Sequence, residues 1–104
     1  MRATKEDIIN FLEELKPELS RHGISNLALF GSFSTNTQGV YSDIDIAISK
    51  EKNFLDNYSS YSYFDIISSI KTKVKNRFHR NIDVFDLDSN SEFKQSIQKE
   101  LIYV

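Results

Sequence analysis

Apolar and polar residues alternate along this chain with two different periods, and the periods divide the chain into helices and strands. Apolar residues recur every three to four positions in three stretches, which is the spacing of an amphipathic helix. These stretches run from Thr4 to about Arg21, from Phe64 to Arg77, and from about Ser91 to Leu101. We therefore predict three helices, one at each end of the chain and one between them.

The first predicted helix carries signals for its start and its end. Thr4, followed three residues later by Asp7, resembles a capping box, and His22-Gly23 is a typical helix stop. Pro17 lies inside the apolar stripe. Because proline lacks an N–H group and clashes with the preceding turn, we expect the helix to kink or restart there.

Three shorter apolar runs predict strands at Ile24–Phe30, Asp43–Ile48 and Ile82–Phe85. A polar loop joins the first two, with a short helical turn expected just after Ser32. Side chains two apart on a strand point to the same face. Asp43 and Asp45 should therefore lie side by side, opposite the isoleucines at 44, 46 and 48.

The order of these elements is helix, strand, strand, helix, strand, helix. This order predicts an α/β (α+β) fold in which helices cover one face of a small mixed β-sheet. The carboxylates should then lie on the other face or at the edge of the sheet. At 104 residues, we expect residues 1–104 to form a single domain.

Composition excludes several classes of protein. The 13 Lys and Arg residues against 15 Asp and Glu give a net charge of −2, so the total charge does not indicate direct binding to nucleic acid. No apolar run approaches the roughly 20 residues of a membrane span, and the N-terminus does not resemble a signal peptide. The chain contains no Cys, which excludes disulfides and thiolate metal sites. We expect a cytoplasmic protein without a membrane segment.

The candidate chemistry lies at the junction of the first two strands. Asp43 and Asp45 repel each other unless a cation lies between them or one of them is protonated. Their oxygens suit a hard divalent ion such as Mg²⁺. Gly31-Ser32 follows the first strand, where backbone N–H groups can approach a phosphate closely. A phosphate site facing a metal-binding carboxylate pair indicates phosphoryl or nucleotidyl transfer.

Gly31-Ser32, ten intervening residues and Asp43-x-Asp45 resemble the signature of the polymerase-beta-like nucleotidyltransferases, and of the minimal nucleotidyltransferase family in particular. The resemblance covers essentially the whole chain, including the ending Ile97–Val104. It implies the polymerase-beta-like nucleotidyltransferase fold and a third catalytic carboxylate on a later strand. Asp83 occupies the expected place.

The resemblance also implies a mechanism. Asp43, Asp45 and Asp83 would be the catalytic and metal-binding residues for two Mg²⁺ ions, with ATP as the substrate. Gly31 and Ser32 would hold the β and γ phosphates. Members of the family usually carry Arg-Gly where this chain has Thr35-Asn36. Asn36 tolerates left-handed backbone, whereas Thr35 cannot replace a guanidinium.

The resemblance implies a protein partner as well. Minimal nucleotidyltransferases pair with helical HEPN-domain proteins in toxin–antitoxin systems, in which AMP is transferred from ATP to a tyrosine of the ribonuclease toxin. Our leading hypothesis is therefore that this protein is such an antitoxin. One alternative is a non-catalytic antitoxin that neutralises its partner by forming a complex. A second alternative is nucleotidyl transfer to a small molecule by a self-associated enzyme.

Other polar and aromatic residues have simpler interpretations. Asp86 and Asp88 fit a turn in which carboxylates accept hydrogen bonds from backbone donors. The basic run Lys71–Arg80 is typical of the solvated face of a helix, with binding to a partner or to nucleic acid as the alternative. Tyr58, Tyr61 and Tyr63 are typical of packing or interface residues, with stacking on adenine as the alternative.

Overall fold

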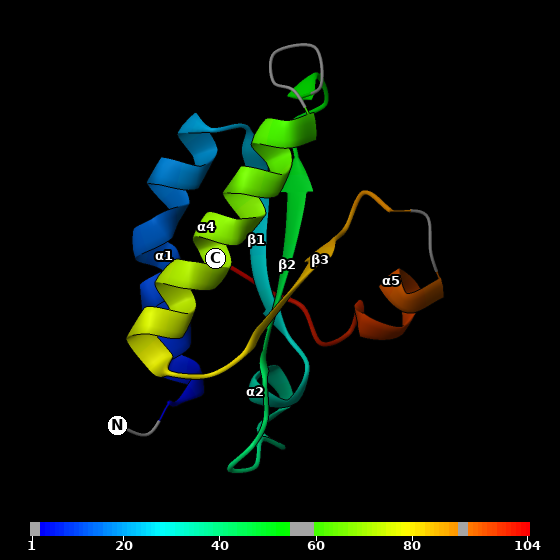
Figure 1. The fold of residues 1–104 in the computed structure, drawn as a ribbon. Coiled ribbons are helices and arrows are strands. Elements are labelled where there is room, and N and C mark those ends of the chain that lie inside the picture. Colours follow the sequence, from blue (N-terminus) through cyan, green and yellow to red (C-terminus); the bar gives the residue numbers. More distant parts are fainter. Residues whose placement is uncertain (1–2, 55–59, 90–91) are drawn as a thin grey trace.

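The computed structural model describes residues 3–54, 60–89 and 92–104 of the chain, and the structural statements below refer to these residues. The described chain has eight elements of secondary structure, which Figure 1 shows in order along the colour bar. They are α1 (Lys5–Arg21), β1 (Ile24–Phe30), α2 (Ser32–Thr35), β2 (Ile44–Lys50), α4 (Ser60–Phe78), β3 (Ile82–Asp86), α5 (Glu92–Ile97) and β4 (Ile102–Tyr103).

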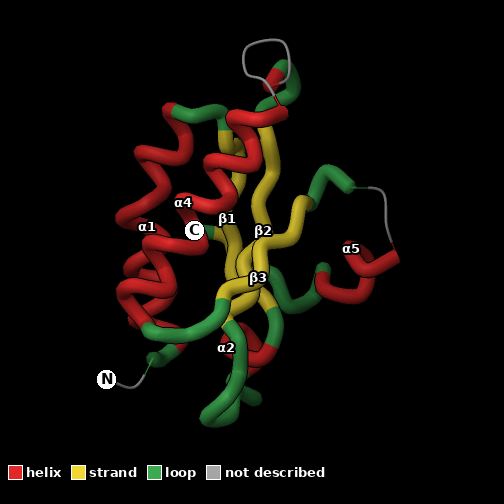
Figure 2. Tube along the Cα trace, viewed as in Figure 1, coloured by secondary structure: helices red, strands yellow, loops and turns green. Residues whose placement is uncertain are grey.

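The strands form one mixed sheet in the order β3-β2-β1-β4. Strand β1 pairs antiparallel with both β2 and β4, whereas β2 and β3 are parallel. Two parallel neighbours need a long crossover, and α4 supplies it. Figure 2 shows the sheet between the long helices α1 and α4 on one side and the short helix α5 on the other. The predicted small mixed sheet with helices is confirmed, but the expectation that helices cover only one face is wrong, because α5 packs on the face opposite α1 and α4.

The larger core lies between the sheet and the two long helices. It contains apolar side chains from β1 and β2 and the stripe of α1, namely Leu27, Leu29, Ile44, Ile46, Ile48, Ile8, Leu12, Leu15 and Leu19. Full burial of such a side chain contributes roughly 1.5–3 kcal/mol. The alternation read from the sequence is confirmed, because the three isoleucines of β2 all belong to this core.

A smaller core lies on the opposite face of the sheet, beneath α5. It consists of Ala28, Phe30, Ala47, Leu87 and Ile97, with Phe85 and Leu101 packed against it. Because β1 and β2 contribute mainly alanines here, this face is shallow. The residues that alternate with the larger core along β2, including Asp45, point to this side.

Helix α1 starts and ends where the sequence predicts. The hydroxyl of Thr4 accepts a hydrogen bond of 3.1 Å from the backbone N–H of Asp7, and Gly23 takes a φ of +88° after the helix. The restart expected at Pro17 does not occur, since one helix runs through it. The buried Leu15 and Leu19 on either side of Pro17 pack on the same core, which offsets the one lost backbone hydrogen bond.

Strand β2 starts one residue later and ends two residues later than predicted, β3 ends one residue later, and two helix boundaries differ more. Helix α4 begins at Ser60, four residues earlier than predicted, and α5 ends at Ile97 rather than Leu101. The residues after α5 instead form β4, whose Ile102 pairs with Leu29, while the N–H of Val104 donates to the carbonyl of Leu27 at 2.9 Å. The unpaired edge of β1 offers these hydrogen bonds, and a pairing so distant in sequence leaves no local signal. No helix in the described part of the chain is long and apolar enough to cross a membrane.

Candidate active site

Strand register brings two of the predicted aspartates together. In the parallel pair of β2 and β3, Asp45 lies directly beside Asp83, and on its other side Asp45 is paired with Phe30 at the end of β1. Paired positions on neighbouring strands share a face of the sheet, so both carboxylates lie on the face that carries α5. The fold therefore joins a motif at the start of one strand to a residue 38 positions later in the sequence.

The environment of Asp45 disfavours its negative charge. Burial, the charges of Asp83 and Asp43, a hydrogen bond with Asp83 and the charge of Glu100 together raise the pKa of Asp45 from 3.8 to about 6. None of the ion pairs between described residues includes Asp45 or Asp83. Carboxylates held this close require either a proton or an external cation.

The donor set of this pair fits a divalent ion. Its ligand atoms are carboxylate oxygens, which Mg²⁺ prefers, and an ion there would offset the repulsion that raises the pKa of Asp45. Asp43 is placed differently, because β2 begins one residue after it and its side chain is exposed. Among the described residues, no three His, Cys, Asp or Glu side chains already form a metal site. The structure thus pairs Asp45 with Asp83, whereas Asp43 lies near them but just before the start of β2.

Gly31 is required at the turn between β1 and α2 for two reasons. Its φ of +77° lies in the region that favours glycine, and an added Cβ would lie only 2.1 Å from Oδ2 of Asp45. Ser32 then begins α2, which confirms the helical turn expected there. Asn36 ends α2 with a φ of +60°, so it keeps the left-handed conformation expected of it. The Thr35 hydroxyl lies 2.9 Å from that of Thr37 and makes only local contacts.

Glu100 belongs to this site although the sequence reasoning gave it no role. The N–H of Gly31 donates to Oε1 of Glu100 at 3.0 Å, and the hydroxyl of Ser34 donates to the backbone carbonyl of Glu100. One residue of the C-terminal segment therefore holds both ends of the turn from Gly31 to Ser34. A phosphate could use the Gly31 amide only if the Glu100 carboxylate moved away. The resemblance of Ile97–Val104 to the family's ending was the only sequence signal.

Arg80 is a second residue that the sequence reasoning placed wrongly. Helix α4 ends at Phe78, so Arg80 does not lie on the solvated face of that helix. Its Nη1 donates to the carbonyls of Val40 and Ser42 at 3.1 and 2.8 Å, and its guanidinium lies 5.1 Å from the centre of the Phe33 ring. Arg80 thereby fixes the segment that leads into Asp43.

Two cavities flank the carboxylates. One, of about 500 Å³, is lined by Asp45, Asp83 and apolar side chains below α5. The other, of about 210 Å³, is lined by Asp43 and by the basic residues Lys75, His79 and Arg80. A mainly apolar cavity at the Asp45–Asp83 pair and a basic cavity at Asp43 could receive two different parts of a ligand.

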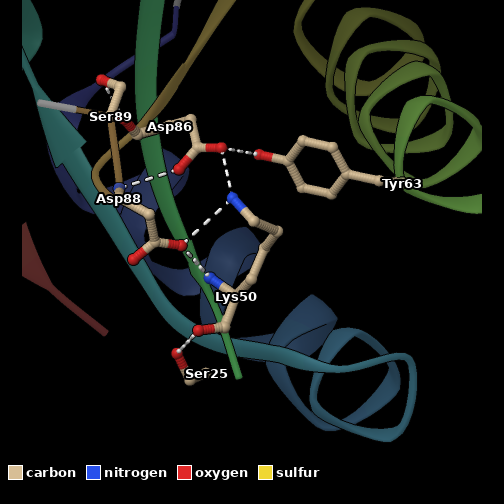
Figure 3. A network of polar contacts seen from close by, with 6 residues as sticks. All are labelled: Ser25, Lys50, Tyr63, Asp86, Asp88 and Ser89. Atoms are coloured by element: carbon tan, nitrogen blue, oxygen red, sulfur yellow. Dashed lines mark hydrogen bonds and ion pairs between the residues drawn. The ribbon is translucent and has the colours of Figure 1, made fainter. Parts of the chain in front are cut away.

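A second group of carboxylates lies at the other end of the same two strands (Figure 3). We call Lys50, Tyr63, Asp86 and Asp88 the Lys50 cluster. Nζ of Lys50 pairs with Asp86 and, at 3.2 Å, with Asp88, and the hydroxyl of Tyr63 donates to Asp86 at 2.7 Å. The N–H of Asp88 donates to Oδ1 of Asp86 at 2.8 Å, which confirms the turn predicted for these residues.

Of the three tyrosines predicted to be packing or interface residues, the structure describes the side chain of Tyr63 alone. Tyr63 packs edge-on against Phe54, with ring centres 5.5 Å apart, so its packing role is confirmed. Tyr58 and the side chain of Tyr61 lie outside the described residues.

Comparison with known proteins identifies the family. The model of the family described as "Polymerase beta, Nucleotidyltransferase" matches residues 13–104. Two proteins of Methanocaldococcus jannaschii, both provisionally named protein adenylyltransferases, are similar over 104 residues. MJ0126 is 30% identical, with 97% of this chain and 98% of the relative covered, and MJ1379 is 32% identical, with 89% and 97% covered.

A solved structure is similar as well. A crystal structure of a toxin–antitoxin with AMP-PNP aligns with a TM-score of 0.52 and 26% identity, covering 86% of this chain. The present chain spans 61% of the length of that chain. The sheet register, the Gly31 turn and these matches agree, and the chain belongs to the polymerase beta nucleotidyltransferase family.

Proposed function

We propose that this protein is a Mg²⁺-dependent adenylyltransferase that moves AMP from ATP to a tyrosine of a HEPN-domain toxin, and so acts as the antitoxin. The observation that carries the proposal is the pairing of Asp45 with Asp83 beside Gly31. The similarity to a toxin–antitoxin structure with AMP-PNP and to the two M. jannaschii proteins supports the nucleotide and the partner class. We also propose that residues 1–104 act as one domain, in the cytoplasm.

The chain's own residues would orient the reactants. Ser32 and the Gly31 turn would hold the triphosphate, while Asp83 would accept a hydrogen bond from the incoming hydroxyl. The hydroxyl oxygen forms a bond to the α-phosphorus, the bond from that phosphorus to the β-phosphate oxygen breaks, and diphosphate leaves. The hydroxyl proton passes to solvent through the carboxylates. Mg²⁺ ions bound by Asp43, Asp45 and Asp83 would neutralise the phosphate charge and acidify the attacking hydroxyl.

AMP attached to the toxin's tyrosine would explain how the toxin is inactivated. A phosphodiester adds bulk and a negative charge to the tyrosine. In a cleft that binds RNA, this charge repels the phosphate backbone.

The test takes the product of the neighbouring open reading frame as the candidate HEPN toxin, incubates it with this protein, ATP and Mg²⁺, and measures its intact mass by mass spectrometry. We expect the mass of AMP on the partner, and its loss when Mg²⁺ is chelated or when Asp45→Asn is used. The matched control is Asp65→Asn, which removes an exposed carboxylate of α4 and should leave the transfer unchanged. An unmodified partner after incubation with the wild-type protein would refute the proposal.

Thr35 motivates one alternative, a non-catalytic antitoxin that works by complex formation. Its hydroxyl bonds only within residues 31–37 and supplies no positive charge to the loop. Under this alternative, the double variant Asp45→Asn/Asp83→Asn would still neutralise the toxin in cells. Under the proposal above, that variant fails to protect.

A further inference from the structure

Three phenylalanines from three different elements meet beside the carboxylates. Phe30 ends β1, Phe85 lies on β3 and Phe93 lies on α5. The ring centres of Phe85 and Phe93 are 5.0 Å apart, those of Phe30 and Phe93 are 6.0 Å apart, and those of Phe30 and Phe85 are 6.4 Å apart. All three pairs have edge-to-face geometry, so the rings form one continuous aromatic surface.

The outer ring of this surface is not buried by the fold. Phe30 is only 5% exposed, whereas Phe93 remains 49% exposed. All three rings line the cavity of about 500 Å³ that also contains Asp45 and Asp83. A half-exposed aromatic ring that opens onto a cavity with two carboxylates is well placed to contact a ligand.

The two cavities differ in what they could accept. If a nucleotide places its phosphates at Gly31–Ser32 and its metal ions at Asp45, its base must lie within one nucleotide's length of them. The cavity beside Asp43 is lined by Lys75, His79 and Arg80, which suit anionic or strongly polar groups, and its lining has one aromatic side chain, the exposed Tyr41. The other cavity presents three rings that pack against one another. A neutral, planar base is better accommodated against aromatic rings, because base and ring stack with little loss of hydration.

We propose that the cavity bounded by Phe30, Phe85 and Phe93 is the nucleobase subsite, with the Phe93 ring as the stacking platform. This inference rests on the proposed nucleotidyl transfer and adds to it the location of the base. It replaces Tyr63 as a candidate for stacking, since the Tyr63 hydroxyl donates to Asp86 on the opposite face of the sheet.

The residues that line this cavity also determine which nucleobases we expect it to prefer. Stacking on an aromatic ring is tolerant of the base, because every base has a π-face. The polar atoms at the rim come from Ser96 and Glu100, and the Ser96 hydroxyl already donates to the carbonyl of Phe93 at 2.7 Å. We therefore expect similar affinities for ATP and GTP and a lower affinity for CTP, whose smaller base covers less of the ring.

The test compares a ligand that has a base with one that lacks it. Binding of ATP and of inorganic tripolyphosphate, both with Mg²⁺, is measured by isothermal titration calorimetry on the wild type, Phe93→Ala and Phe93→Tyr. We expect Phe93→Ala to weaken ATP binding about 10-fold and leave tripolyphosphate binding unchanged. Phe93→Tyr keeps an aromatic ring and should bind ATP as the wild type does.

Two controls keep the result interpretable. Phe64→Ala removes a 65% exposed phenylalanine from α4, away from this cavity, and should change neither affinity. Because the chain contains no Trp, Phe93→Trp introduces its only tryptophan at the platform, and this can be excited selectively beside the tyrosines. Its emission should be quenched by MgATP and not by tripolyphosphate. This readout does not depend on the stability of the alanine variant.

The outcomes separate this inference from the proposed function. Wild-type protein that binds both ligands, with ATP affinity unaffected by Phe93→Ala, overturns the nucleobase subsite alone. Equal weakening of ATP and tripolyphosphate also overturns it, because Phe93 would then support the phosphate site. Wild-type protein that binds neither ligand contradicts the proposed nucleotidyl transfer, and the subsite falls with it.

Discussion

Strands β2 and β3 carry one group of carboxylates at each end, and the two groups are built in opposite ways. At the start of the strands, Asp45 and Asp83 face each other without a cation among the ion pairs of the described residues, and the pKa of Asp45 is raised to about 6. At their other end, burial tends to raise the pKa of Asp86, but hydrogen bonds from Lys50 and Tyr63 outweigh it and lower that pKa. Five residues of β2, roughly 16 Å, separate Asp45 from Lys50.

The difference shows how a carboxylate's environment indicates its role. The Lys50 cluster contains its own counter-charge and fastens the turn after β3 to β2 and α4 (Figure 3). The Asp45–Asp83 pair has no counter-charge among the ion pairs of the described residues, so its two negative charges oppose folding until a proton or an external cation binds. Perturbed groups of this kind mark functional sites, whereas satisfied ones stabilise structure.

The largest expected effect is a loss of catalytic rate when one carboxylate of the Asp45–Asp83 pair is removed. Asp83→Asn should lower the rate of AMP transfer about a thousandfold, because it removes a carboxylate from the reacting atoms. Asp88→Asn, which alters the Lys50 cluster, should leave the rate per folded molecule within about twofold. The measurement is transfer of radiolabel from α-labelled ATP, with folded protein quantified by circular dichroism. Equal losses in the two variants would remove the distinction between the clusters.

Gly31 provides the next test, because it lies against the pair. Gly31→Ala places a Cβ 2.1 Å from Oδ2 of Asp45 and puts a side chain on backbone with a φ of +77°. We expect about a hundredfold loss of transfer rate and a destabilisation of about 1–3 kcal/mol. Gly39→Ala is the matched control, since its Cβ would meet only Ser42 Oγ at 3.9 Å. Kinetics and urea unfolding measure the two effects separately, and a fully active Gly31→Ala protein would contradict the close approach.

Lys50→Met tests how much the Lys50 cluster contributes to the free energy of unfolding. Removing the lysine leaves Asp86 and Asp88 facing each other, so we expect a loss of about 2 kcal/mol at pH 7. A lowered carboxylate pKa stabilises the fold above its unfolded value of 3.8, and this contribution is lost as pH falls through the lowered value. The difference from wild type should therefore shrink below about pH 4. A constant difference from pH 7 to pH 3 would show that lost packing, not charge, causes it.

The smallest predicted effect is a gain of stability, whereas the preceding variants lose stability or activity. Asp45→Asn should stabilise the protein without Mg²⁺ by about 1 kcal/mol above pH 6, after allowance for its partial exposure to solvent. Because the pKa of Asp45 is raised from 3.8 to about 6, the ionised form is disfavoured in the fold, and the gain should disappear below about pH 4. Thermal melts at pH 7.5 and pH 3.5 measure it. A destabilised Asp45→Asn protein at pH 7.5 would show that the charge is already compensated.

Local patterns predicted most of the framework. Helical and alternating periods located α1 and the strands β1, β2 and β3 because each buries one face, and the turn at Gly31-Ser32 followed from residue types alone. The positions of Glu100 and Arg80 could not be predicted in this way. Their contacts to Gly31 and to Ser42 span 69 and 38 residues, so only the folded sheet brings them together.

The same limit applies to the site itself. The sequence motif named Asp43 and Asp45, and the family resemblance added Asp83, but the register that sets Asp45 beside Asp83 depends on the parallel crossover through α4. The aromatic surface was missed for a related reason, since Phe30, Phe85 and Phe93 lie on three separate elements and each resembles an ordinary core residue in sequence.

The most direct test of the central claim is to locate a divalent ion on the protein by NMR, with Mn²⁺ as a paramagnetic substitute for Mg²⁺. We predict that substoichiometric Mn²⁺ with ATP first broadens the backbone signals of Gly31, Asp45 and Asp83, and that Asp45→Asn/Asp83→Asn abolishes this broadening. Signals from the Lys50 cluster should be affected last. Earliest broadening at Asp86 and Asp88, or broadening that persists in the double variant, would contradict the account.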